Sequence, residues 1–236
     1  MVLGVLALAA AGCSVGTAAS GGARATPPTT TAPATTTTTQ APLPVVPVAW
    51  SPCNGGLQCG TVAVPVNYAD PTAGILHLAV ARRPASDPAQ RIGSIVINPG
   101  GPGASGIDDL PTELRVLTAG LLDRFDIVSF DPRGVGRSAP VSCEQGPTGT
   151  DNANPPAQLP DPTPTDAASA KALLDNDTTY AAACVKATGT SLDFVGTTDA
   201  AMDLDRIRAA LGDAQLTYIG HSYGTLLGET YADLYP

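Results

Sequence analysis

The chain has 236 residues, of which 43% are hydrophobic, 4% aromatic and 14% charged. This length is enough for one well-buried core and too short for two large domains. Twelve basic residues stand against 21 acidic ones, a net charge of −9, so the composition offers no basic surface that could neutralise the phosphates of a nucleic acid. We therefore expect no nucleic-acid partner.

The chain opens with an apolar segment that ends at a cysteine. Residues 1–12 (MVLGVLALAAAG) are too few to span a bilayer, which takes about 20 residues, but they suit the apolar core of a signal peptide. The small residues before Cys13 resemble the cleavage box of bacterial lipoproteins, in which the cysteine carries the lipid. A plain secretory signal with an incidental cysteine is the alternative, because no basic residue precedes the apolar run and Ala10 stands where leucine is usual. Both interpretations predict a secreted or cell-envelope protein that meets a membrane only through such an anchor.

Residues 13–48 form a low-complexity region that is rich in threonine and proline. Without apolar periodicity this region cannot bury a core, and its prolines favour an extended chain. We predict a tether here and a folded body over residues 49–236.

Short apolar segments alternate with helical patterns through the folded body. Strands are predicted at residues 61–66, 75–81, 94–97, 126–130 and 216–219. Helices are predicted at residues 111–118, 167–187, 198–211 and 225–234, the first of them opening on Pro111. Pro65 predicts an edge position for the first strand, whereas the last three strands are short and apolar, which is typical of parallel strands covered on both faces. The alternation predicts an α/β fold with a mostly parallel sheet.

The cysteines support an exported protein. With Cys13 set aside as the lipid site, four of the five cysteines remain, an even number that can form two disulfides outside the cytosol. The predicted pairs, one of three possible connectivities, are Cys53–Cys59 and Cys143–Cys184. Their spacing matches neither a zinc site nor a C-x-x-C redox motif, and buried free thiols are the alternative. The second bond would staple an inserted loop and helix, residues 142–187.

The sequence G-H-S-Y-G at residues 220–224 fits the G-x-S-x-G pattern of a nucleophile elbow, and it lies between the last predicted strand and the last predicted helix. Such a turn holds the serine in a strained conformation, and Gly220 and Gly224 avoid clashes with the neighbouring backbone. The hydroxyl of Ser222 is then exposed beside a helix N-terminus, which stabilises negative charge. We predict Ser222 as a nucleophile, with the side chain of His221 directed away from it. A serine that merely caps the helix is the alternative.

The glycine-rich sequence N-P-G-G-P-G at residues 98–103 directly follows the predicted strand 94–97. Acyl transfer develops an oxyanion that needs hydrogen-bond donors aimed at it in advance, and glycines let backbone N–H groups approach a substrate closely. We predict that the N–H groups of Gly101 and Tyr223 form this oxyanion hole. A plain turn is the alternative, and a phosphate-binding loop is disfavoured because no G-K-[ST] follows.

The sequence D-P-R-G-V-G-R-S at residues 131–138 follows the strand 126–130. Asp131 is a candidate acid for a catalytic triad, but in this order of elements the acid should come after the serine. We therefore predict that the segment supports the oxyanion loop, with Asp131 and Arg133 capping turns.

The three motifs in this order resemble the tripeptidyl and prolyl aminopeptidase branch of the α/β-hydrolases, above all its secreted actinobacterial members. The similarity extends from about Trp50 to Pro236. It implies the α/β-hydrolase fold, with Ser222 as the nucleophile and Gly101 and Tyr223 as oxyanion donors. It also implies peptide substrates cut from their free N-termini through an acyl-enzyme, with neither a metal nor an organic cofactor.

The resemblance also implies an Asp and a His beyond the elbow. Only two histidines are present, His77 within a predicted strand and His221, and Pro236 comes fourteen residues after Ser222. We therefore expect a fragment truncated after the nucleophile elbow, inactive by itself, with an open sheet edge. An esterase or lipase of the same fold and a non-catalytic surface lipoprotein are the alternatives. The G-G-P-G loop favours the peptidase.

Overall fold

The computed structural model describes residues 43–143 and 161–236. The predicted signal segment 1–12, the lipid site at Cys13, most of the tether 13–48 and residues 144–160 of the inserted segment lie outside the described residues.

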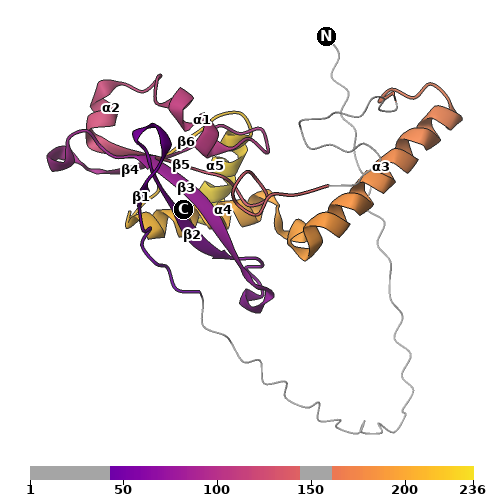
Figure 1. The fold of residues 1–236 in the computed structure, drawn as a ribbon, viewed down its shortest axis with the longest axis horizontal. Coiled ribbons are helices and arrows are strands. Elements are labelled where there is room, and N and C mark those ends of the chain that lie inside the picture. Colours follow the sequence, from indigo (N-terminus) through magenta and orange to yellow (C-terminus); the bar gives the residue numbers. More distant parts are fainter. Residues whose placement is uncertain (1–42, 144–160) are drawn as a thin grey trace, which may run out of the picture. The chain divides into compact units, whose positions relative to one another are not determined.

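A six-stranded sheet with the strand order β1-β2-β3-β5-β4-β6 forms the centre of the fold (Figure 1). The strands are β1 Ser51–Pro52, β2 Gln58–Pro65, β3 Ile75–Arg83, β4 Gly93–Asn98, β5 Phe125–Phe130 and β6 Tyr218–Gly220. The pairs β4–β5 and β4–β6 are parallel, whereas β1–β2, β2–β3 and β3–β5 are antiparallel. The sheet is therefore mixed, and its parallel half consists of the three short apolar strands for which parallel pairing was predicted.

The described residues also form five α-helices and four 3-10 turns. The helices are α1 Gly106–Glu113, α2 Ala119–Arg124, α3 Ala167–Thr188, α4 Thr197–Leu211 and α5 Tyr223–Leu234. The turns are η1 Asn54–Gly56, η2 Pro71–Ala73, η3 Pro88–Gln90 and η4 Gly189–Phe194. Among the described helices none is both long and apolar enough to cross a membrane.

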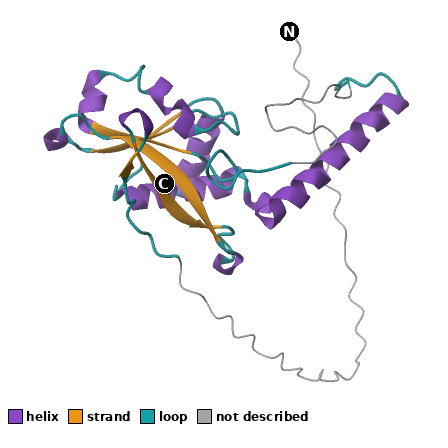
Figure 2. Cartoon of the chain, in the orientation of Figure 1, coloured by secondary structure: helices purple, strands orange, loops and turns teal. Residues whose placement is uncertain are grey.

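Both faces of the parallel half of the sheet are covered, because side chains along a strand point alternately to its two faces. Helices lie on the two sides of the sheet (Figure 2). Val96 and Val128 belong to one cluster with Leu204 and Ile207 of α4, whereas Ile95 and Ile97 belong to the cluster of α1 and α2. Burial on both faces explains why these strands read as continuous apolar segments.

The first predicted helix was placed wrongly. It was expected to open on Pro111, but α1 begins at Gly106 and contains Pro111 within it. Two side chains determine this start: the hydroxyl of Ser105 accepts from the backbone N–H of Asp108, and the carboxylate of Asp131 accepts from that of Ile107. The helix α2 was not predicted.

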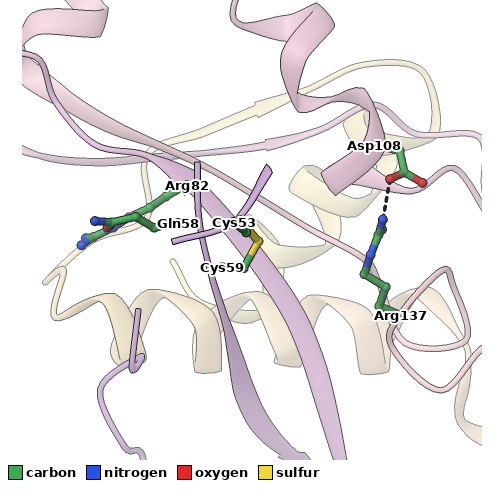
Figure 3. The surroundings of a disulfide bond; sticks show 6 residues. All are labelled: Cys53, Gln58, Cys59, Arg82, Asp108 and Arg137. Carbon is green, nitrogen blue, oxygen red and sulfur yellow. Dashed lines mark hydrogen bonds and ion pairs between the residues drawn. A yellow bond between two sulfur atoms is a disulfide. The ribbon is translucent and has the colours of Figure 1, made fainter. Parts of the chain in front are cut away.

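Both predicted disulfides are present. Cys53–Cys59 closes the connection between β1 and β2 (Figure 3), and Cys143–Cys184 joins the start of the inserted segment to α3. Because β1 pairs only with the first two residues of β2, the half of β2 that ends at Pro65 has β3 as its sole partner among the described strands. The edge position predicted from Pro65 is confirmed for that half.

The segment before β1 lies against α4. The guanidinium of Arg206 donates to the backbone carbonyls of Leu43 and Pro44, and the N–H of Val48 donates to the carbonyl of Ala210. These contacts join the last residues of the predicted tether to the folded body.

Candidate active site

Ser222 occupies the sharp turn between β6 and α5. Its backbone angles are φ 52° and ψ −123°, a conformation that a residue with a side chain adopts only under strain, and its side chain is exposed and makes no capping bond to the helix. The helix-capping alternative therefore finds no support. The neighbouring glycines are required sterically: a Cβ on Gly220 would lie 2.3 Å from the carbonyl oxygen of Gly224, and one on Gly224 would lie 2.6 Å from that of Asn98.

The glycine-rich loop after β4 packs directly on this turn. The carbonyl of Asn98 accepts from the backbone N–H of His221 at 3.0 Å. Gly100 has φ 92°, and a Cβ on it would lie 2.4 Å from the carbonyl oxygen of His221 and 2.9 Å from the nitrogen of Tyr223. The two segments that sequence reasoning brought together are therefore in contact.

The two predicted oxyanion donors are unused in this arrangement. Among the described residues, none accepts a hydrogen bond from the backbone N–H of Gly101 or from that of Tyr223. Tyr223 is the first residue of α5, where the N–H groups have no partner within the helix. Its side chain is held separately, since its hydroxyl lies 2.8 Å from the hydroxyl of Thr197 at the start of α4.

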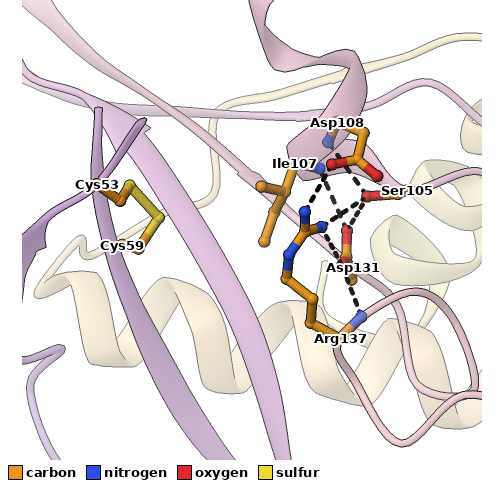
Figure 4. Close-up of polar contacts among 7 residues, drawn as sticks. All are labelled: Cys53, Cys59, Ser105, Ile107, Asp108, Asp131 and Arg137. Atoms are coloured by element: carbon orange, nitrogen blue, oxygen red, sulfur yellow. Dashed lines mark hydrogen bonds and ion pairs between the residues drawn. A yellow bond between two sulfur atoms is a disulfide. The ribbon is translucent and has the colours of Figure 1, made fainter. Parts of the chain in front are cut away.

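Asp131 bonds residues that follow the glycine-rich loop, and no described residue of 98–103 itself, so its predicted support of that loop is indirect (Figure 4). Its buried carboxylate accepts from the hydroxyl of Ser105 at 2.5 Å, the N–H of Ile107 at 3.2 Å and the N–H of Arg137 at 2.8 Å. The guanidinium of Arg137 also contacts it at 3.2 Å and binds Asp108 at 2.7 Å. This bond lowers the pKa of Asp108. The carboxylate of Asp131 therefore holds the start of α1, the helix that follows the glycine-rich loop. Both oxygens of this carboxylate accept hydrogen bonds from these neighbouring groups of the fold.

Arg133 does far more than cap a turn. Its fully buried guanidinium binds both carboxylate oxygens of Asp203 in α4, at 2.6 and 2.7 Å. The remaining N–H groups donate to backbone carbonyls of Pro65, Val66 and Phe194. Sequence reasoning missed Asp203 because it lies 70 positions away.

Burial and pairing with Asp203 together set the protonation of this cluster. Burial acts to lower the pKa of Arg133, but the hydrogen bonds and charge of Asp203 outweigh it and raise that pKa. Burial raises the pKa of the Tyr68 hydroxyl, which donates to Asp203 at 2.8 Å, and the Asp203 charge adds to this shift. Tyr68 therefore remains a donor, and the guanidinium remains charged.

The two histidines lie in different surroundings. His77 is exposed on β3, which β5 and β4 separate from β6 in the sheet. The half-exposed imidazole of His221 lies 3.2 Å from the carboxylate of Glu113 in α1, a partner that sequence reasoning missed. An open cavity of about 550 Å³ beside the oxyanion loop is lined by Pro99, Ala104, Ser105, Asp108, Asp109 and Glu113. Within residues 43–143 and 161–236, no group of three His, Cys, Asp or Glu side chains could hold a metal ion.

Comparison with known proteins agrees with this geometry. The chain is 40% identical over 201 residues to "Serine protease Hip1" of Mycobacterium tuberculosis, which covers 80% of this chain and 37% of the relative. It is 36% identical over 193 residues to "Tripeptidyl aminopeptidase" of Streptomyces lividans, covering 76% and 33%, and 35% identical over 156 residues to "Carboxylesterase B" of Mycobacterium tuberculosis, covering 65% and 29%. The chain thus spans about a third of the length of these relatives. The model of the alpha/beta hydrolase fold matches residues 93–236, which include β4, the glycine-rich loop and the elbow, and the chain belongs to this family.

Proposed function

We propose that the protein is an exported serine peptidase that removes peptides from free N-termini, with Ser222 as its nucleophile. The single observation that carries the proposal is the strained, exposed Ser222 at the β6–α5 turn, with the loop of residues 98–103 packed against it. The names of two relatives, a serine protease and a tripeptidyl aminopeptidase, support peptide substrates.

The proposed chemistry is acyl transfer. The hydroxyl oxygen of Ser222 attacks the carbonyl carbon of the substrate, and the carbonyl oxygen takes up negative charge. The N–H groups of Gly101 and Tyr223 stabilise this charge; losing one such donor typically costs about 2.7–4 kcal/mol of transition-state stabilisation. A general base takes the proton of the hydroxyl and passes it to the nitrogen of the departing amine as the C–N bond breaks. Water then adds to the acyl-enzyme, the acid is released, and a proton returns to the oxygen of Ser222. A serine hydroxyl needs an adjacent base at neutral pH, and neither described imidazole is assigned this role, since His77 belongs to β3 and His221 pairs with Glu113.

Export is supported by the two disulfides, because such bonds persist in oxidising compartments. Anchoring through a lipid on Cys13 belongs to the same proposal. Mass spectrometry of the mature N-terminus tests this anchoring. A diacylglycerol-modified cysteine is expected. An unmodified N-terminus would refute the lipid anchor and support the plain secretory signal instead.

The peptidase proposal is tested with the protein expressed from its complete reading frame. We expect release of a dye from a tripeptidyl anilide, no release when the N-terminus is acetylated, and loss of activity in Ser222→Ala. Thr230→Ala is the matched control, because it removes a hydroxyl from the same helix, α5. Among the described residues, this hydroxyl bonds only the carbonyl of Leu226. Equal cleavage of the acetylated substrate would refute the requirement for a free N-terminus.

An esterase is the second candidate, and the 35% identity to a carboxylesterase favours it. The oxyanion arrangement serves esters as well as amides, so the same preparation is assayed with aryl esters. Hydrolysis of esters with no cleavage of any peptide amide would make the esterase the correct assignment.

A further inference from the structure

Asn98 links the two segments of the candidate active site. It is the last residue of β4 and is only 1% exposed. Its backbone carbonyl accepts from the N–H of His221 in the elbow, and its side-chain oxygen Oδ1 accepts from the N–H of Gly100 at 2.9 Å. One residue therefore holds both the elbow and the loop.

The side-chain amide of Asn98 has only one chemically sensible orientation. The N–H of Gly100 needs an acceptor, so the oxygen must face it; turning the amide over would place two donors against each other. In this orientation Nδ2 is buried and has no hydrogen-bond partner among the described residues. Burying an unpaired donor costs free energy. The unpaired Nδ2 therefore cancels part of the stabilisation that Oδ1 provides by accepting from the N–H of Gly100.

A side chain on Gly224 would disturb the contact between Asn98 and the elbow. A Cβ on Gly224 would lie 2.6 Å from the backbone oxygen of Asn98 and 3.0 Å from Oδ1. Asn98 thus lies in close contact with Gly224 in the first turn of α5. Tyr223, immediately before Gly224, carries one of the two candidate oxyanion N–H groups, and Gly101, immediately after Gly100, carries the other.

We infer that Asn98 is a positioning residue that sets the distance between the two oxyanion donors. Its Oδ1 restrains the loop at Gly100, and its backbone oxygen restrains the elbow at His221, so the N–H groups of Gly101 and Tyr223 are held toward one point. The inference rests on the proposed acyl-transfer function. A displacement of about 1 Å in such a site can cost about 100-fold in rate.

The test compares Asn98→Ala, which removes the acceptor, with Asn98→Ser, which differs from it by one neutral hydroxyl that can still accept from the N–H of Gly100 two residues on. The protein from the complete reading frame is titrated with a fluorophosphonate to count working sites, and kcat and KM are measured per site. We expect kcat of Asn98→Ala to fall about 100-fold with KM changed less than about threefold, because donors that act mainly in the transition state affect kcat. Asn98→Ser should recover at least about threefold of this loss, because its hydroxyl accepts in the same way but more weakly.

Ile95→Val is the matched control, since it trims a buried side chain of the same strand that belongs to the apolar cluster of α1 and α2. It should lower the melting temperature and leave kcat per site unchanged. If Asn98→Ala behaves like this control, its role is only structural and the inference is wrong. If Asn98→Ser loses as much kcat as Asn98→Ala, the assignment to Oδ1 is wrong.

The two hypotheses fail in different ways. If the unmutated protein cleaves esters only, the peptidase proposal fails, but the ratio of kcat between Asn98→Ala and the unmutated protein on the ester still decides the inference. If it cleaves peptide amides and Asn98→Ala keeps full kcat, the inference alone fails. If it cleaves neither substrate, both fail.

Discussion

Replacing Arg133 by methionine is expected to destabilise the fold strongly. The substitution keeps much of the side-chain volume but removes all five hydrogen bonds of the buried guanidinium. It leaves a carboxylate, Asp203, that is 1% exposed, and three backbone carbonyls without their donor. Among the described neutral groups, only the hydroxyl of Tyr68 would still donate a hydrogen bond to the carboxylate of Asp203.

The magnitude follows from the burial of the pair. Removing one partner of a buried ion pair costs about 3–5 kcal/mol, because the other charge is left uncompensated. For a domain of this size each kcal/mol lowers the melting temperature by about 2–4 °C, so Arg133→Met should lower it by roughly 6–20 °C. Urea unfolding followed by circular dichroism measures the loss of free energy directly.

The matched control is Lys171→Met. Lys171 pairs with Asp175 on the surface of α3 at 2.5 Å, with both side chains mostly exposed, and such a pair contributes only about 0.3–0.5 kcal/mol. In a double-mutant cycle, Arg133→Met combined with Asp203→Leu should be less destabilised than the sum of the single variants, by up to about 3 kcal/mol. A loss below about 1 kcal/mol in Arg133→Met, or strict additivity, would contradict the assigned role of this pair.

Two further substitutions test the loop and the inserted helix. In urea unfolding, Gly100→Ala should lose about 1–3 kcal/mol more stability than Gly103→Ala. Both glycines have positive φ, but only a Cβ at Gly100 would meet backbone, 2.4 Å from the carbonyl oxygen of His221. Equal losses in the two variants would show that the loop can move aside. Hydrogen bonds from Ser169 lower the pKa of Asp166 from its ordinary 3.8, so its capping of α3 is fully present above that pH and is lost as the pH falls through the lowered value. An acid titration of helicity should show this step, Asp166→Ala should lack it, and identical titrations would contradict the prediction.

Local patterns were sufficient for most elements of the fold. The strands β2 to β6 and the helices α3 to α5 follow from short apolar segments and helical periodicity, and α3 and α4 differ from their predicted bounds by a single residue. The serine turn was found because G-x-S-x-G combines tight sterics with a strand before it and a helix after it. The cysteine pairing was correct as well.

Contacts between distant residues could not be predicted in the same way. The start of α1 depends on Asp131, which lies 24 positions beyond Ile107, so Pro111 was a misleading local signal. The partner of Arg133 lies on another helix, and Glu113 approaches His221 only because α1 packs beside the elbow. No spacing rule connects these pairs; they arise from the topology of the sheet.

The clamp on the segment before β1 has a mechanical consequence. Arg206 holds the carbonyls of Leu43 and Pro44, so tension applied to the chain from its N-terminal side is borne first by α4. The same helix carries Asp203, locked to Arg133, and Thr197, whose hydroxyl meets that of Tyr223. A pull from that side would therefore load these contacts, and the helix that Asp203 and Thr197 hold, before it reached β1.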